Sequence, residues 1–191
     1  MKTISIIGEI GSGKTYVANN FGYVVFNADK EINKIYKNNR KCFKLLKKKF
    51  PYNISKFPIS KKELARLILI KKKNILLIGK IVHPFVRKNL NIFLKKHKKI
   101  NKVLDIPLLL ENKIKIKGNI LIFVKSKKYN IQKFLKKRIN FNKKLYDIMR
   151  ENQLKSNYKE KKADFVIKND FRKMTILKQI FKIKKKVKLN D

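Results

Sequence analysis

The segment Gly8 to Thr15, GEIGSGKT, constrains this chain more than any other, because it fits the pattern G-x-x-x-x-G-K-[ST]. It directly follows a short apolar run, Thr3 to Ile7, that suits a buried parallel strand, and it opens a helical segment, Lys14 to Phe21. Glycines let a backbone wrap closely around phosphates, and the N–H groups of the loop and of the helix N-terminus point at the negative charge. The segment is therefore a P-loop, and the chain is predicted to bind a nucleotide.

Separate roles are predicted for the residues of this loop. Lys14 is expected to bridge the β- and γ-phosphates of ATP and to act in catalysis, and the Thr15 hydroxyl is expected to bind Mg²⁺. A glycine-rich turn without function is the alternative, but both the strand before the motif and the helix after it are present. The predicted ATP contacts in this region are Gly8, Gly11, Ser12, Gly13, Lys14, Thr15 and Tyr16.

Apolar, β-type runs recur later in the chain and alternate with helical stretches. Such alternation predicts an open α/β sheet with both faces covered, so we expect a P-loop NTPase three-layer sandwich with a five-stranded parallel sheet. The four runs after the first are Tyr23 to Phe26, Lys102 to Leu104, Asn119 to Val124 and Asp164 to Ile167.

A helical insertion is predicted between residues 30 and 99, where apolar residues such as Leu64, Leu67 and Ile68 recur at helical spacing. The core of this single 191-residue chain would then consist of residues 1–29 and 100–191.

Three further helix positions are predicted from local signals. The dipeptide His83-Pro84 is expected to start a helix, since proline is tolerated in a first turn and disfavours helix immediately before it. The basic stretches Ile131 to Arg138 and Lys144 to Lys155 are also predicted to be helical.

The net charge of +40 ordinarily suggests a polyanionic partner. Lysine supplies 46 of the 52 basic residues, however, and it is spread along the chain among many Ile and Asn residues. A surface selected for nucleic acid would favour clustered arginine with interleaved aromatics. Biased coding composition is therefore the preferred explanation, a selected polyanion role is the alternative, and no specific nucleic-acid partner is predicted.

Other partners and compartments are also limited by the composition. The single cysteine, Cys42, cannot form an internal disulfide, and no Cys/His cluster has zinc-ligand spacing. No apolar segment approaches the roughly 20 residues of a membrane span. We therefore expect a cytoplasmic protein without a membrane partner, and no particular oligomeric state is predicted.

Five blocks in this order resemble the signature segments of dephospho-CoA kinases and cover nearly the whole chain. The His-Pro block and the Pro-Leu-Leu-x-Glu block together are quite specific to that family, whereas the P-loop alone is generic. The blocks are Gly8 to Thr15, Asn27-Ala28-Asp29, Val82 to Arg87, Asp105 to Glu111, and Ala163 to Asn169.

The resemblance implies a catalytic role for Asp29, at the second carboxylate of the family's Asp-x-Asp motif. There it would accept or orient the proton of the ribose 3′-hydroxyl. The alternative is an N-cap for a helix beginning near Lys30. The first carboxylate of the motif is Asn27 here, a departure from the family pattern.

Asp105, at the end of the third predicted strand, is placed like the acidic residue that holds Mg²⁺ opposite a P-loop threonine, with a loop cap as the alternative. By resemblance, the acceptor would contact His83, Arg87, Pro107, Leu108 and Glu111. A structural or acceptor-contact role is preferred for His83 over acid/base catalysis.

A mobile lid is predicted at residues 128–150. Arg138 matches the family's lid arginine that closes over the ATP phosphates and assists catalysis, with a solvated basic helix face as the alternative. Asn169 matches a position near the adenine. Further departures from the family are Glu9, Asn33 and Lys143.

The resemblance thus implies an ATP- and Mg²⁺-dependent kinase that phosphorylates the ribose 3′-hydroxyl of dephospho-CoA, the last step of coenzyme A biosynthesis. Two alternatives stay open at this point. One is another small P-loop kinase with a nucleoside monophosphate or shikimate-like acceptor. The other is a basic, nucleic-acid-stimulated ATPase.

Overall fold

The structure is a computed structural model that describes residues 1–139 and 141–189. Residue 140 of the predicted lid and residues 190 and 191 of the predicted core lie outside this range. The chain forms two compact units. The sheet unit comprises Met1–Asn27, His97–Phe141 and Arg150–Asp191, and the helical unit comprises Ala28–Lys96 and Asn142–Met149.

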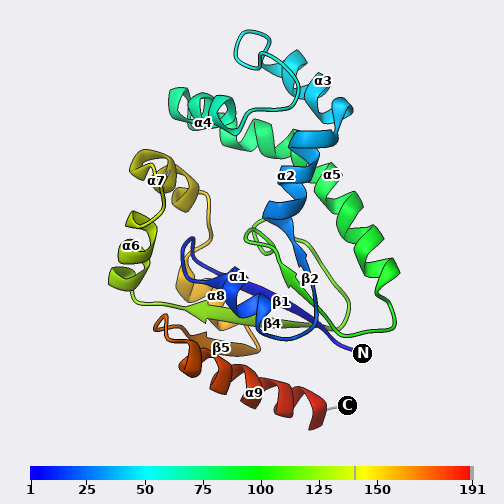
Figure 1. Cartoon of the computed structure of the whole chain (residues 1–191), viewed down its shortest axis with the longest axis vertical. Helices are drawn as coiled ribbons and strands as arrows, with labels where there is room; N and C mark the ends of the chain where they lie inside the picture. Colours follow the sequence, from blue (N-terminus) through cyan, green and yellow to red (C-terminus); the bar gives the residue numbers. More distant parts are fainter. Residues whose placement is uncertain (140, 190–191) are drawn as a thin grey trace. The chain divides into compact units, whose positions relative to one another are not determined.

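A five-stranded parallel sheet organises the sheet unit, in the order β2-β3-β1-β4-β5 (Figure 1). The prediction of five parallel strands is confirmed. Each strand coincides within a residue or two with an apolar run, as expected for strands buried on both faces. The strands are β1 (Thr3–Gly8), β2 (Val24–Asn27), β3 (Lys102–Asp105), β4 (Asn119–Lys125) and β5 (Phe165–Lys168).

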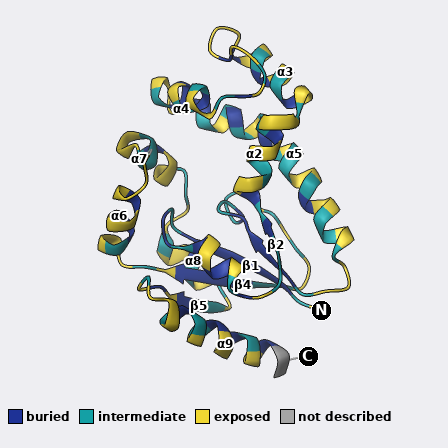
Figure 2. Ribbon diagram, viewed as in Figure 1, coloured by how far each residue is buried: buried dark blue, intermediate teal, exposed yellow. Residues whose placement is uncertain are grey.

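Helices cover both faces of this sheet. The helices α1 (Lys14–Asn19) and α9 (Lys173–Leu189) share one apolar core with Ile4 and Ile6 of β1. The helix α8 (Ser156–Lys162) lies on the β4-to-β5 connection, which runs along the sheet in the opposite direction from the β1-to-β2 connection. Because such crossovers are right-handed, α1 and α8 lie on opposite faces. The central strands are accordingly dark blue in Figure 2.

The helical unit has its own apolar core. Cys42, Leu46 and Ile54 are fully buried in it, so Cys42 acts as a small apolar side chain. Its helices are α2 (Ala28–Asn38), α3 (Arg40–Lys49), α4 (Lys61–Ile70), α5 (Asn74–Lys96) and most of α7 (Lys143–Glu151). Residues 142–149, predicted as lid, group with this unit.

The prediction that His83-Pro84 starts a helix is wrong, because α5 runs through Pro84 without interruption. Pro84 lies on the exposed side of α5, whereas Ile78, Val82 and Leu90 bury the opposite side. Burial of this apolar stripe outweighs the hydrogen bond that the proline ring removes.

A second helix prediction, Lys144 to Lys155, is wrong at its end. The helix stops at Glu151, residues 152–155 form a non-helical connector, and α8 begins at Ser156. The helix α6 (Lys128–Lys136) precedes this region. Within the described residues, none of the helices combines the length and apolar composition needed to cross a bilayer.

Replacing Pro84 with Ala should stabilise the helical unit. Alanine restores the missing N–H to the middle of α5 and relieves the ring clash, which is worth about 1–3 kcal/mol at an exposed helix position. Thermal and urea unfolding should show the gain. An unchanged or lower unfolding midpoint would mean that the rest of α5 depends on the proline.

Candidate functional site

The P-loop joins β1, which ends at Gly8, to α1, which begins at Lys14. Gly13 has a positive φ of 87°, which favours glycine. A Cβ atom on Gly13 would also lie 2.3 Å from Nδ2 of Asn169. Two independent constraints therefore require glycine at this position, and they bring the loop against the end of β5.

The second half of the loop is held through the carbonyl oxygen of Ser12. This oxygen accepts hydrogen bonds from Asn169 Nδ2 at 2.8 Å and from the Ser126 hydroxyl at 3.0 Å. The Ser12 hydroxyl itself is buried and makes no hydrogen bond within residues 1–139 and 141–189. A phosphate oxygen would satisfy this buried hydroxyl.

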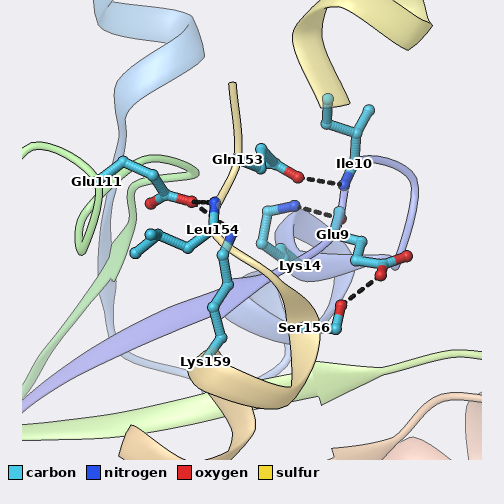
Figure 3. Close-up of polar contacts among 8 residues, drawn as sticks. All are labelled: Glu9, Ile10, Lys14, Glu111, Gln153, Leu154, Ser156 and Lys159. Atoms are coloured by element: carbon cyan, nitrogen blue, oxygen red, sulfur yellow. Dashed lines mark hydrogen bonds and ion pairs between the residues drawn. The ribbon is translucent and has the colours of Figure 1, made fainter. Parts of the chain in front are cut away.

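Lys14 is buried, and its Nζ donates a hydrogen bond of 2.7 Å to the carbonyl oxygen of Glu9. The ammonium group therefore lies inside the curve of its own loop (Figure 3). An ammonium held there is close to the backbone N–H groups that a P-loop offers to phosphates.

Thr15, Asp105 and Asn27 meet at the carboxyl end of the sheet. Oδ2 of Asp105 accepts hydrogen bonds of 2.6 Å from the Thr15 hydroxyl and 2.6 Å from Asn27 Nδ2. The strand register places Asn27 of β2 beside Asp105 of β3, so the sheet itself determines this contact. Both carboxyl-end residues lie where open α/β sheets bind ligands.

The Thr15 and Asp105 oxygens fit Mg²⁺, which prefers hard oxygen ligands and shares them with phosphates and water. Among the described residues, no three His, Cys, Asp or Glu side chains form a metal-binding group. A site here would therefore depend on a bound nucleotide for further ligands.

The connector 152–155 contacts the first half of the P-loop (Figure 3). Oε1 of Gln153 accepts a hydrogen bond of 3.3 Å from the backbone N–H of Ile10. Just beyond the connector, the Ser156 hydroxyl donates a short hydrogen bond to the Glu9 carboxylate. The departure at Glu9 thus gives the loop an additional anchoring group.

Glu111 lies in the turn that follows β3, together with Pro107 and Leu108. Its Oε1 accepts a hydrogen bond of 3.0 Å from the backbone N–H of Leu154 and lies 2.6 Å from Nζ of Lys159. The second contact is an ion pair that lacks ideal hydrogen-bond angles. Within the sheet unit, Glu111 therefore holds the connector and α8.

Arg138 follows α6 and is exposed, with its guanidinium carbon 5.2 Å from the centroid of the Phe134 ring. The Phe134 ring in turn lies 5.3 Å from that of Phe171. Ile131 and Leu135, on the buried side of α6, would contact a Cβ atom on Gly11 at 3.0 Å. The first helix of the predicted lid is thus packed on the P-loop, and Arg138 lies just beyond this fixed part.

Among the remaining predicted site residues, Tyr16 is exposed on α1 of the sheet unit, whereas Asp29, His83 and Arg87 belong to the helical unit. Asp29 is exposed in the first turn of α2, which begins at Ala28, so it is not the N-cap of that helix. Asn33 is exposed on the same helix. Lys143 is exposed and pairs with Asp147 one turn later in α7 at 3.3 Å.

His83 is half-buried on α5, and its ring lies over Gly79, where a Cβ atom would approach it within 3.1 Å. Burial lowers the pKa of the His83 imidazole below its usual value, and the positive charge of Arg87 lowers it further. Both causes favour the neutral imidazole, so the cationic side chains on this part of α5 are those of Lys80, Arg87 and Lys88.

Several residues at this site were missed from the sequence. Each makes its contact across a long sequence separation, and none belongs to a local motif. The aromatic residue Phe134 in a lysine-rich helix was the only available signal. The missed residues are Ser126, Phe134, Gln153, Ser156, Lys159 and Phe171.

The comparisons with known proteins agree with this geometry. A dephospho-CoA kinase of Wolbachia pipientis wMel is 32% identical over 193 residues, which cover 98% of each chain. The solved structure of TT1252 from Thermus thermophilus has 26% identity and a TM-score of 0.77 over 95% of each chain. The dephospho-CoA kinase from Campylobacter jejuni, 22% identical with a TM-score of 0.62 over 97% of each chain, shares the fold.

The family model described as dephospho-CoA kinase matches residues 2–174, nearly the entire length. That span includes the P-loop, the Asp105 and Glu111 turn and Asn169. The chain belongs to the dephospho-CoA kinase family.

Proposed function

We propose that this chain transfers the γ-phosphate of ATP to the ribose 3′-hydroxyl of dephospho-CoA and so forms coenzyme A. The observation that carries the proposal is the P-loop, whose Thr15 hydroxyl donates a hydrogen bond to the Asp105 carboxylate. The chain also belongs to this kinase family. Phosphoryl transfer depends on positioning and charge stabilisation, and a P-loop with an opposed carboxylate supplies both.

The loop residues would bind the nucleotide. Backbone N–H groups from Gly11 to Thr15 and the N-terminus of α1 would surround the phosphates. Lys14 would exchange its bond to the Glu9 carbonyl for the β- and γ-phosphates, and the Ser12 hydroxyl would gain a partner. Tyr16 and Asn169 complete the predicted ATP contacts.

Mg²⁺ would be held by Thr15 and Asp105 together with the nucleotide, and it supplies neutralisation of phosphate charge. Asn27 donates a hydrogen bond to Asp105 and so holds its carboxylate in place. The carboxylate that the family has at the Asn27 position is thus replaced by a group that orients Asp105.

Asp29 is proposed to accept or orient the proton of the acceptor hydroxyl. It is exposed in the first turn of α2, so its carboxylate can reach a ligand and benefits from the helix N-terminus. Orientation of the hydroxyl would contribute along with proton transfer.

The helical unit, residues 30–99 in the predicted division, would bind the acceptor. A shallow groove of about 490 Å³ runs along α5 and is lined in part by Arg87, Lys88 and Lys95. Three cations beside Pro84 and Ile92 suit a ligand that carries both phosphates and an apolar arm. Pro107, Leu108 and Glu111 are the acceptor contacts predicted from the sequence in the sheet unit.

In the predicted lid at 128–150, the part that follows α6 would close over ATP and exclude water, since α6 itself is packed on the P-loop. Arg138 would then exchange its contact with Phe134 for the transferred phosphoryl group. Catalysis would therefore depend on Lys14, Asp29 and Arg138. A cytoplasmic location, predicted from the sequence, stays a prediction.

Incubation with ATP, Mg²⁺ and dephospho-CoA, followed by mass analysis, tests the function directly, and coenzyme A is the expected product. A parallel screen with nucleoside monophosphates and shikimate covers the alternative acceptors. ATP turnover that rises with DNA or RNA and falls steeply with salt would instead support the nucleic-acid-stimulated ATPase.

Replacing Lys14 with Ala should reduce phosphoryl transfer to background, because no other group replaces an ammonium between the β- and γ-phosphates. The measurement is coupled ADP release with thermal unfolding as the control for folding. A folded variant with near wild-type turnover would remove Lys14 from the mechanism.

Replacing Asp29 with Asn should lower turnover roughly 10²-fold and preserve ATP affinity, since a positioned base contributes about 10²- to 10⁴-fold. Glu31→Gln removes the same charge from the same first turn of α2, and it should keep near wild-type turnover. Thermal unfolding is measured alongside, because the Glu31 carboxylate pairs with Lys34 and accepts a hydrogen bond from Asn89. If both variants keep their turnover, the acceptor proton is taken elsewhere.

Replacing Arg138 with Lys should lower turnover about tenfold or more, the loss expected for one charge-assisted hydrogen bond. ATP affinity should change less, because a lysine keeps the charge and lacks only the planar fork. Lys136→Gln and Lys137→Gln remove whole charges from the same region and should have smaller effects. Equal losses in all three variants would mean that the lid acts only as a diffuse basic surface.

A further inference from the structure

We propose that Glu111 and Lys159 are positioning residues that hold the P-loop through the connector 152–155, and that Glu111 does not bind the acceptor. The inference rests on the proposed kinase function. It assigns Glu111, Lys159 and Gln153 to nucleotide binding, as residues that support the P-loop. Figure 3 shows the contacts that carry it.

The ion pair between Glu111 and Lys159 lies in the interior of the sheet unit. The Lys159 side chain is 1% exposed and that of Glu111 is 11% exposed, with 2.6 Å between Nζ and Oε1. Two charges leave water only at a large cost, so each depends on the other being in place. The pair therefore fixes the start of α8 against the turn after β3.

The same carboxylate oxygen also holds the connector. Oε1 of Glu111 accepts the backbone N–H of Leu154 at 3.0 Å, in addition to its contact with Lys159. Oε1 of Glu111 thus contacts Leu154 in the connector and Lys159 in α8, and so holds the chain on both sides of Ser156. An acceptor molecule would have to compete with both contacts for this oxygen.

The fixed segment presents two side chains to the P-loop. Gln153 accepts from the backbone N–H of Ile10 at 3.3 Å, and the Ser156 hydroxyl donates to the Glu9 carboxylate. Both contacts fall in the first half of the loop. The second half is held independently by Asn169 and Ser126 at the Ser12 carbonyl.

Holding both halves matters because a phosphate cradle stabilises charge only when its donors are already oriented. The carbonyl oxygen of Glu9 also accepts a hydrogen bond from the Lys14 ammonium. Displacement of Glu9 and Ile10 would therefore move the catalytic lysine as well. Loss of the connector contacts should therefore weaken nucleotide binding and lower turnover, with no direct effect on the acceptor.

The first test variant is Gln153→Ala, which removes one acceptor from a half-exposed side chain. Loss of one hydrogen bond should raise the Kd of ADP by about 3- to 10-fold. Binding is measured by titration calorimetry with ADP and Mg²⁺ and with no acceptor present. An unchanged Kd overturns the proposal.

The second variant combines Glu111→Leu with Lys159→Met, so that apolar side chains of similar size replace both buried charges and the fold is retained. The Kd of ADP and the KM of ATP should rise about tenfold or more, whereas the KM of dephospho-CoA should stay within about twofold. Lys161→Met, an exposed cation on the same helix, is the matched control and should leave all three constants unchanged.

A pair variant that folds and raises only the KM of dephospho-CoA would make Glu111 an acceptor residue and overturn the proposal. ADP binding is measured without acceptor, so the proposed function can fail separately. If ADP binding responds as expected but no coenzyme A forms, the acceptor assignment is wrong and the role of the connector stands.

Discussion

The parallel pairing of β1 with β3 on one side and β4 on the other determines where the chemical groups of the sheet unit lie. Parallel strands end at the same edge, so the P-loop after β1, Asp105 of β3 and Ser126 after β4 converge there. The register also places Asn27 beside Asp105. Because these residues end up at one edge of the sheet, their side chains lie close enough to form the polar contacts of the P-loop.

The strands and the P-loop could be predicted because each depends on local sequence. A short run rich in apolar and β-branched residues is typical of a buried parallel strand, and Thr3 to Ile7, interrupted only by Ser5, is such a run. The course of α5 could not be predicted from the His83-Pro84 dipeptide, since burial of Ile78, Val82 and Leu90 outweighs the local preference. At Pro84, packing of the helix therefore overrides the local preference of the sequence.

The site was predictable only where its residues lie in motifs. Gln153 and Lys159 contact Ile10 and Glu111, which are far away in sequence. The sequence on either side of Gln153 and Lys159 resembles the other basic stretches of the chain. Burial in the folded chain distinguishes a residue such as Lys159 from the many exposed lysines. Among the described residues, Lys14, Lys102 and Lys159 are the buried lysines, and each has an oxygen partner, whereas the lysine excess lies at the surface.

The close approach of Asn169 to Gly13 links the two ends of the gene. The space that a side chain at position 13 would need is taken by the amide of Asn169, which bonds the neighbouring Ser12 carbonyl. A chimera that joins the first half of this chain to the second half of a relative must therefore inherit compatible residues at both positions. Because Gly13 itself leaves room, such a chimera would lose the hydrogen bond from residue 169 to the Ser12 carbonyl if the new residue lacks a side-chain donor, and with it one anchor of the P-loop.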